Sequence, residues 1–305
     1  MFRAFFIALS ESRTIRNVAE RSAIGRKLSG RFVAGMSVEA ALSATAATAA
    51  KGMSVSVDNL GENVTNTEEA KHSAQLYHDI LDQIASRKLN ANASLKLTHM
   101  GLDVDEKLAL DITNDIVAHA ARIDNFIRID MEGSPYTEKT LRFVKELHRK
   151  PGNAKHVGAV IQAYLHRSEN DVKELCAEGI RIRLCKGAYK ESADIAFQDK
   201  ADVDANFVKL MKILLESGTY HGIATHDPKM IEATIAFARE RNIPPSAFEF
   251  QMLYGVRRDL QEQLVKDGWG MRVYIPFGSE WYPYLMRRLA ERPANAIFIL
   301  KNLFR

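Results

Sequence analysis

Residues 180–189 read IRIRLCKGAY, in which Ile182 and Leu184 alternate with Arg181 and Arg183. Successive side chains of a β-strand point to opposite faces, so this alternation predicts a strand with one apolar face and one charged face. Gly187 follows the alternating part, and glycine is typical of the turns that bound strands. The segment therefore predicts a strand whose apolar face packs in a core while its charged face meets polar surroundings.

Runs of this kind recur along the 305 residues, and between them apolar residues lie three or four positions apart, which is the helical period. The eight runs are MSVSVDNLG from Met53, ASLKLT from Ala93, FIRIDME from Phe126, HVGAVIQAY from His156, IRIRLCKGAY from Ile180, HGIATHD from His221, FEFQMLYG from Phe248 and MRVYIPFG from Met271. Eight strand–helix units without a Gly-rich linker predict an α/β fold, a closed parallel (β/α)8 TIM barrel over residues 51–305. A helical N-terminal arm precedes it over residues 1–50.

Local signals place the ends of the intervening helices. Thr67 is predicted to cap the helix after the first strand, and Gly218 to follow the helix before the sixth. Asp227 followed by Pro228 predicts an N-cap and a first helical position. No GxGxxG or Walker P-loop motif follows any run, which disfavours a dinucleotide-binding open sheet and a P-loop enzyme.

The alternation also divides each run into helix-facing and barrel-facing residues. The barrel-facing set is polar or ionisable and comprises Ser56, Asp58, Ser94, Lys96, Arg128, Asp130, Gln162, Arg181, Arg183, His226, Glu249, Gln251, Arg272 and Tyr274. Barrel interiors are ordinarily filled by Val, Ile and Leu, and unpaired buried charges are costly. The set therefore predicts an ionic network, a polar ligand or both. The simpler interpretation is that these ions pair only to specify the fold, but barrel enzymes place their chemistry at the carboxyl ends of strands.

The last strand leads into VYIPFGSEWYPYLMRRLAERP, residues 273–293. Tyr284, Arg287, Arg288 and Glu291 lie three or four apart and share one side of a helix. Adjacent arginines on a helix usually form a solvated face. Because this helix follows a barrel strand directly, the pair also suits a site at the barrel mouth, where arginines grip a small carboxylate with bidentate hydrogen bonds.

Composition narrows the class of protein. Lysine and arginine number 42 against 38 aspartates and glutamates, a net charge of +4. Both signs are spread along the chain, which excludes a dedicated nucleic-acid binder and is compatible with an anionic cofactor or a membrane surface. Cys176 and Cys185 match no zinc or redox motif, so we expect a reducing, cytoplasmic compartment. No run reaches the roughly 20 apolar residues that span a bilayer. An N-terminal apolar patch either contacts lipid or packs on the barrel, and it contains Phe2, Phe5, Phe6, Ile7 and Leu9.

Taken together, the motifs resemble those of proline dehydrogenase, the flavin-dependent family that begins proline catabolism. In family order they are LKLT (95–98), RIDME (128–132), IQAYL (161–165), RLCKGAY (183–189), ATHD (224–227), FEFQMLYGVR (248–257), VYIPFG (273–278) and WYPYLMRRLAERP (281–293). The resemblance covers essentially the whole chain and is to the monofunctional bacterial form, without the aldehyde dehydrogenase half of the bifunctional proline utilisation proteins. It implies a distorted (β/α)8 barrel whose final helix lies over the mouth.

The resemblance also implies the site residues, with FAD at the carboxyl ends of the strands and L-proline beside it. The implied catalytic group is Arg183, which approaches flavin N5, together with Lys96, Asp130 and Tyr274. The other implied cofactor contacts are Gln162, Lys186, Gly187, Tyr189, Thr225, His226 and, near the ribose, Glu291. The implied residues that bind the substrate carboxylate are Lys96, Arg287 and Arg288. Asp130 and Glu62 pair with this cationic cluster. Tyr274 and Leu253 shape the pocket for the proline ring. Lys190 departs from the bifunctional relatives, which often carry an aromatic residue there, so the adenine-end contacts stay unassigned.

The implied reaction is oxidation of L-proline to Δ1-pyrroline-5-carboxylate, the first step of proline catabolism to glutamate. A hydride passes from proline C5 to flavin N5, and the cations stabilise the negative charge that develops on the flavin. The reaction needs no metal and no protein nucleophile. The electrons pass to a membrane quinone, so the resemblance implies peripheral contact with the inner face of the membrane.

Two other classes of protein fit parts of the pattern. A Schiff-base aldolase would use a strand-borne lysine, Lys96 or Lys186, and would need no flavin. A non-catalytic barrel that serves as a partner scaffold would be colourless and inactive, and the polar interior argues against it.

Basic neighbours would favour the neutral amine of Lys96, whereas a bound carboxylate with Asp130 or Glu62 would favour its ammonium. We expect the ammonium once substrate is bound.

Overall fold

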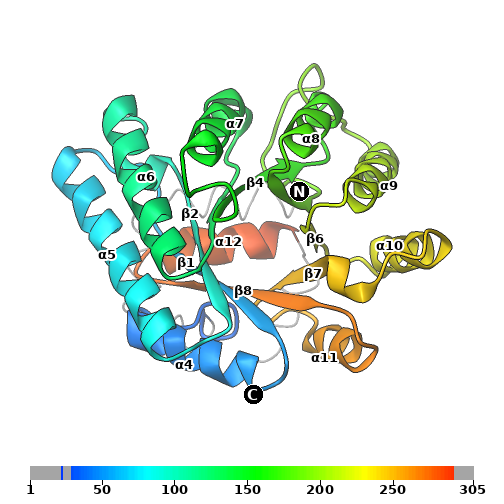
Figure 1. Cartoon of the computed structure of the whole chain (residues 1–305), viewed down its shortest axis with the longest axis horizontal. Coiled ribbons are helices and arrows are strands. Elements are labelled where there is room, and N and C mark those ends of the chain that lie inside the picture. Colours follow the sequence, from blue (N-terminus) through cyan, green and yellow to red (C-terminus); the bar gives the residue numbers. More distant parts are fainter. Residues whose placement is uncertain (1–21, 23–28, 292–305) are drawn as a thin grey trace.

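The chain forms a closed barrel of eight parallel strands in the computed structural model, which describes residue 22 and residues 29–291, with the backbone alone for residues 287–291. The strands are β1 (Ser54–Asn59), β2 (Ala91–Leu95), β3 (Ile127–Ile129), β4 (Val157–Gln162), β5 (Arg181–Cys185), β6 (His221–Ala224), β7 (Phe248–Leu253) and β8 (Met271–Phe277). Each strand pairs with the next in sequence, and β8 closes the ring on β1 (Figure 1). The predicted strands and the predicted barrel are confirmed.

Helices follow the strands, as the 3.6-residue period predicts. The described α-helices are α4 (Val38–Ala49), α5 (Thr67–Ser86), α6 (Glu106–Arg122), α7 (Ser134–Arg149), α8 (Ser168–Ala177), α9 (Lys200–Glu216), α10 (Pro228–Glu240), α11 (Arg258–Lys266) and α12 (Trp281–Glu291). Two 3-10 turns accompany them, η1 (Thr98–Met100) and η2 (Pro245–Ala247). Helix α12 lies across the ring of strands in Figure 1, in agreement with the predicted helix over the mouth.

The capping predictions are confirmed at two helices and wrong by one residue at a third. Asp227 caps α10 by accepting from Lys229 N, with Pro228 at the first helical position. Gly218, with φ +76°, follows the end of α9. The cap of α5 is Asn66, whose side chain accepts from Glu69 N, and Thr67 is the first helical residue. Both are capping residue types, so sequence pattern alone placed the boundary one position late.

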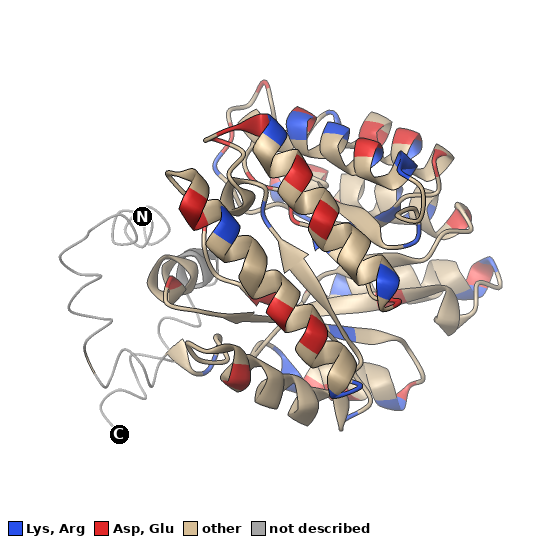
Figure 2. Ribbon diagram, turned by 60° about the vertical axis from the view of Figure 1, so that its left-hand side comes forward, with Lys and Arg blue, Asp and Glu red and all other residues tan. Residues whose placement is uncertain are grey.

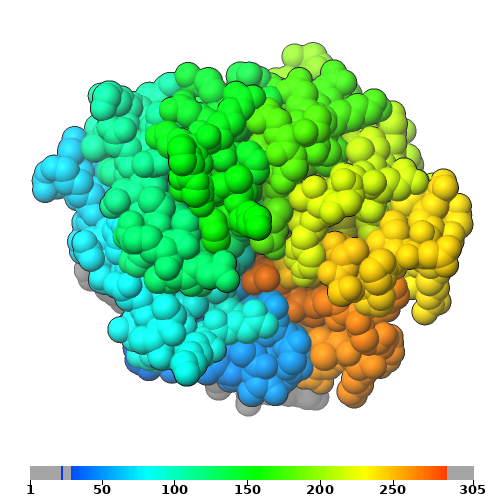
Figure 3. Space-filling view, viewed as in Figure 1, coloured from blue at the N-terminus to red at the C-terminus, as the bar shows by residue number. Residues whose placement is uncertain are grey.

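The helices surround the barrel in chain order (Figure 1), and the sequence colours follow the same order around the surface of the molecule (Figure 3). Lys and Arg are interspersed with Asp and Glu on their outward faces (Figure 2). None of the described helices combines the length and apolar composition that a bilayer span requires. Helix α4 belongs to the predicted N-terminal arm and packs against β1 and β8. The apolar patch at residues 2–9 lies outside the described residues.

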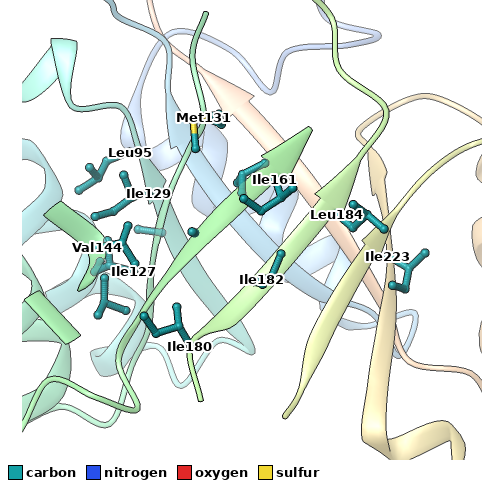
Figure 4. Packing of buried hydrophobic residues seen from close by; sticks show 14 of the residues in the cluster. Leu95, Ile127, Ile129, Met131, Val144, Ile161, Ile180, Ile182, Leu184 and Ile223 are labelled. Carbon is teal, nitrogen blue, oxygen red and sulfur yellow. The ribbon is translucent and has the colours of Figure 1, made fainter. Parts of the chain in front are cut away.

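The apolar faces of the strands pack under the helices and form the main core (Figure 4). Ile182 and Leu184 of β5 are fully buried, as their alternation with the arginines predicts. The pairing of β1 with β8 sets Val55 beside Val273, which carries the apolar face across the barrel seam. Full burial of such a side chain contributes about 1.5–3 kcal/mol, so this shell holds the strands at fixed positions around the interior.

Candidate active site

Arg183 lies at the centre of a connected set of polar side chains inside the barrel. Its Nη1 donates to Asp130 Oδ1 at 2.7 Å and its Nε to Gln251 Oε1 at 2.6 Å. Its Nη2 donates to the hydroxyls of Ser56 and Ser94 at 3.2 and 3.0 Å. A guanidinium has five N–H groups, so these contacts with described residues use four of them and leave one on Nη1 for another acceptor.

Lys96 follows the last residue of β2, and its ammonium lies 3.3 Å from Oδ2 of the fully buried Asp58. Burial alone would lower the pKa of Lys96, but Asp58, Asp130 and Glu62 together raise it above the ordinary lysine value. Burial raises the pKa of Asp58 to about 6, against the opposing charge of Lys96 and with a further contribution from Asp130. Several carboxylates thus surround one ammonium, and Lys96 is charged before any substrate binds.

The geometry adds a partner to the expectation for Lys96. Asp58 forms the ion pair, and Asp130 and Glu62 favour the ammonium as expected. The charge of Lys96 with substrate bound stays a prediction. Register explains the partner: Asp58 pairs with Ser94 across β1 and β2, and Lys96 is two residues further along on the same face. The carboxylates outweigh the effect of burial on the amine.

Tyr274 of β8 connects the two carboxylates. Its hydroxyl donates to Asp130 Oδ2 at 2.9 Å, and the nearby Asp58 carboxylate acts on it electrostatically. Burial and the two carboxylates raise the pKa of Tyr274 well above its ordinary value, so the hydroxyl keeps its proton. The Arg183 guanidinium lies 5.2 Å from the centre of its ring. Lys96, Asp58, Tyr274, Asp130 and Arg183 therefore form one row, hereafter the ionic chain, with an ion pair at each end and the neutral Tyr274 hydroxyl between them.

A second set of contacts holds Arg183 in place. The Gln251 amide accepts from Arg183 and donates to Glu249 Oε1 at 2.7 Å, and Glu249 in turn accepts from Arg272 Nε at 2.6 Å. A Cβ on Gly222 would lie 2.3 Å from Gln251 Nε2, so the absent side chain of β6 makes room for this amide. Gln251 thereby fixes the direction of the guanidinium.

Predicted cofactor residues gather at the carboxyl ends of β4 and β6. Gln162 ends β4, and its Nε2 donates to the Glu132 carbonyl at 2.9 Å. Thr225 and His226 follow β6, where Thr225 is buried. His226 Nε2 accepts from Leu253 N at 2.9 Å, which fixes the ring against the end of β7. The structure therefore brings these residues to the same rim of the barrel.

The loop after β5 carries three more of the predicted cofactor residues, Lys186, Gly187 and Tyr189. Lys186 is ion-paired with Asp204 and with Asp227, the latter at 2.8 Å. This pairing argues against Lys186 as a Schiff-base nucleophile. Gly187 has φ +111°, and a Cβ there would lie 2.2 Å from the Tyr164 ring, so only glycine fits this turn.

The predicted substrate residues come from three places around the mouth. Leu253, at the end of β7, packs beside the aromatic residues of α12. Glu62 lies in the loop after β1 and acts electrostatically on Lys96. Arg287, Arg288 and Glu291 belong to the last turns of α12. Their side chains lie outside the described part of the chain, so their roles stay predictions.

The predicted site omitted Asp58, Gln251 and Glu249, although strand alternation placed all three inside the barrel. The signal that could have found them was register. Asp58 is level with Ser94, two residues before its partner Lys96, and Gln251 is level with Arg272, which bonds Glu249 two residues before it. Alternation predicts which face of the sheet a side chain occupies. Its neighbour on the next strand depends on the register between the two strands, which alternation does not give.

The fold and the site together define a (β/α)8-barrel enzyme with a charged site at the carboxyl ends of its strands. The model of the proline dehydrogenase family matches residues 41–301. Proline dehydrogenase 1 of Bacillus subtilis strain 168 is 41% identical over 306 residues, covering 100% of both chains. Proline dehydrogenase of Deinococcus radiodurans is 36% identical and covers 100% of this chain and 98% of its own. The chain belongs to the proline dehydrogenase family and is an oxidoreductase of that family.

Solved structures place the same fold in larger proteins. The crystal structure of proline utilization A (PutA) from Bdellovibrio bacteriovorus, inactivated by N-propargylglycine, aligns with a TM-score of 0.83 and 27% identity. The alignment covers 95% of this chain and 36% of that one, so this chain spans about a third of that protein. The predicted likeness to the proline dehydrogenase part of bifunctional proteins is confirmed.

Proposed function

We propose that the protein uses FAD to oxidise L-proline to Δ1-pyrroline-5-carboxylate and passes the electrons to a membrane quinone. The observation that supports this most directly is the ionic chain, which presents two fixed cations, Lys96 and Arg183, at the carboxyl ends of the strands. Proline carries a carboxylate and a ring to be oxidised, and the two cations suit two tasks. Lys96 binds the substrate carboxylate, and Arg183 contacts the group that accepts the electrons.

Lys96 serves the substrate because its charge is already set by Asp58. Arg287 and Arg288, from the helix over the mouth, add bidentate hydrogen bonds to the same carboxylate. Tyr274 and Leu253 shape the pocket for the ring, and the hydroxyl of Tyr274 is held by Asp130. The surrounding cations favour the neutral form of the proline amine, which is the form that can lose a hydride.

The residues at the rim fit FAD by their hydrogen-bonding chemistry. Flavin nitrogens and carbonyls and the diphosphate are acceptors, and Arg183 keeps an N–H on Nη1 beyond its contacts with described residues. The residues that would hold FAD are Gln162, Arg183, Lys186, Gly187, Tyr189, Thr225, His226 and Glu291. Bound FAD supplies the hydride acceptor, which no protein side chain provides. Arg183 stabilises the negative charge that develops there, because Gln251 and Asp130 hold its guanidinium in one direction.

Quinone reduction requires contact with the membrane. We propose a cytoplasmic protein that associates peripherally with the inner face. The test is co-sedimentation of the full-length protein with quinone-containing vesicles, together with proline-dependent quinone reduction. Binding to neither quinone-loaded nor quinone-free vesicles, together with transfer only to soluble acceptors, would overturn this part of the proposal.

The absorption spectrum tests the cofactor and the reaction together. The purified protein should be yellow with noncovalent FAD, and anaerobic L-proline should bleach it. A colourless protein that neither takes up FAD nor turns over proline would refute the proposal. Borohydride with a carbonyl substrate tests the Schiff-base alternative: a stoichiometric adduct on Lys96, with turnover that needs no flavin, would establish that mechanism instead. The charged state of Lys96 argues against this outcome.

A further inference from the structure

Two histidines outside the site face each other on the outer layer of the barrel. Nδ1 of His78 on α5 lies 2.7 Å from Nδ1 of His119 on α6, and the near-parallel rings, at 21° to each other, have their centres 5.0 Å apart. Nε2 of His78 lies 3.1 Å from Oδ2 of Asp115, and Nε2 of His119 lies 3.0 Å from Oδ1 of Asp82. Four side chains thus connect the two helices in the order Asp115, His78, His119, Asp82.

The sequence builds this arrangement from two spacings of four residues. His78 and Asp82 share one face of α5, and Asp115 and His119 share one face of α6. Successive helices of a parallel barrel run in the same direction, so each histidine comes level with the aspartate of the other helix. The described side chains of both histidines are largely buried, at 18% and 11% exposure, whereas the aspartates are exposed.

Hydrogen-bond chemistry determines how many protons the two rings carry. A carboxylate only accepts, so each Nε2 must carry a proton to bond its aspartate. The contact between the two Nδ1 atoms needs one proton and one lone pair. Three protons on four nitrogens satisfy every contact, which gives the pair one positive charge. With two protons, either the two Nδ1 lone pairs would face each other or a lone pair would face a carboxylate. With four protons, two N–H groups would face each other at 2.7 Å.

We propose that His78 and His119 form a single proton-binding site. One proton, shared between the two Nδ1 atoms in a hydrogen bond, links α5 to α6. Neither a neutral nor a doubly charged pair can form the Nδ1–Nδ1 hydrogen bond and both Nε2–aspartate hydrogen bonds. The complete link between the helices therefore exists only when the pair carries one positive charge. The proposal is independent of the flavin chemistry, because neither histidine belongs to the ionic chain.

The charged groups that face the rings agree with this assignment. In the described part of the chain they are Asp82 on α5 and Asp115 and Arg122 on α6. Burial lowers the pKa of His78 against the pull of Asp115, and His119 and Arg122 lower it further. His78 is thus the ring that resists the second proton.

The sign of the pH dependence follows from proton counting. Below the ordinary histidine pKa of about 6.5, both rings of the unfolded chain bind protons, whereas the folded pair resists the second. The unfolded state then binds more protons, so the contribution of the pair to stability falls as the pH drops. It also falls at high pH, where loss of the shared proton leaves the lone pairs of the two Nδ1 atoms facing each other.

Nuclear magnetic resonance of the full-length protein with ¹⁵N-labelled histidine counts the protons directly, with His78→Asn and His119→Asn used for assignment. Near neutral pH we expect three protonated ring nitrogens out of four, and a strongly deshielded Nδ1 proton that disappears in either variant. Two or four protonated nitrogens, or two rings that titrate independently near the ordinary pKa, would overturn the proposal.

A double-mutant cycle then tests whether the interaction of His78 with His119 stabilises the fold. Urea unfolding of the wild type, the two single variants and the double variant gives a coupling free energy, which should fall by more than half between neutral pH and pH 5. His72→Asn is the matched control, because His72 is an exposed residue of the same helix. It should show no coupling to His119→Asn at either pH. Equal coupling of His78 and His119 at both pH values would contradict the shared proton, and the spectra of the wild type remain decisive if a variant does not fold.

Discussion

The Lys96 ammonium lies 3.3 Å from the Asp58 carboxylate, and the Asp58 side chain is fully buried. Burial removes most of the water around both groups, so each depends on the other. Tyr274 also favours the Asp58 carboxylate, and Asp130 favours the Lys96 ammonium. Lys96 is therefore a fixed charge supplied by the fold. Under the proposed function, a substrate carboxylate would meet an ammonium already oriented by its partner.

Lys96→Met should separate stability from proline binding. The substitution leaves the Asp58 carboxylate buried without its cation, which we expect to cost about 3 kcal/mol in the free energy of unfolding. Adding Asp58→Asn removes the uncompensated charge, so the double variant should recover most of that stability. Proline affinity should stay low in both variants, because each lacks the ammonium. Urea unfolding and the KM for proline measure the two effects.

Asp58→Asn alone completes this comparison, since it retains the lysine. FAD content should be unchanged in all three variants, because none of the altered side chains belongs to the predicted cofactor set. Recovery of proline affinity in the double variant would contradict the assignment of Lys96 to the substrate carboxylate.

The raised pKa of Asp58 predicts a pH dependence of stability. Its folded value of about 6 lies above the ordinary 3.8, so the folded protein keeps a proton that the unfolded chain has released between these values. Stability relative to Asp58→Asn should therefore fall as the pH rises from about 4 to about 6, by roughly 3 kcal/mol at most. Unfolding of both proteins at several pH values measures the difference. A constant difference would mean that Asp58 ionises as an ordinary carboxylate.

Most of the fold could be predicted from the sequence because period-two alternation recurs eight times. Ile182 and Leu184 face the core and Arg183 faces the interior, as IRIRLCKGAY predicts. The helix cap at Asn66 was missed because Asn66 and Thr67 are both good capping types, and only the hydrogen bond to Glu69 N separates them.

The site was predicted less completely than the fold. Residue types and alternation placed Lys96, Asp130, Arg183 and Tyr274 in one interior, and the structure brings them together. Asp58 as the partner of Lys96 depends on the register between β1 and β2, which alternation does not specify. The contact of His78 with His119 depends on the relative position of α5 and α6 along their axes. No local sequence pattern in either helix specifies the distance between the two rings.

Arg287→Met or Arg288→Met should weaken proline binding. Loss of one charged hydrogen-bonding partner of a carboxylate costs about 2–4 kcal/mol, or roughly 30-fold to 1,000-fold in kcat/KM. The loss should appear mainly in KM, with FAD content retained. Arg239→Met is the control, because Arg239 is exposed on α10 and far in sequence from the mouth helix. Near wild-type kinetics for both mouth variants would refute their assignment to the carboxylate.

Gly187→Ala should disturb the cofactor rim through a steric clash. Its Cβ would lie 2.2 Å from the Tyr164 ring, and φ is +111°, so the loop that carries Lys186 must move. We expect overpacking to cost about 1–3 kcal/mol beyond the backbone strain, and FAD affinity to fall.

Gly179→Ala separates the clash from the strain. Gly179 also has a positive φ, +71°, but a Cβ there meets nothing within 4 Å, so its cost should be limited to about 1 kcal/mol of backbone strain. Gly187→Ala combined with Tyr164→Leu removes the ring edge that the new methyl group meets, and it should recover part of the lost FAD content. Equal FAD content in both glycine variants, measured as the flavin absorbance per chain, would show that the turn at Gly187 does not position the residues that hold the cofactor.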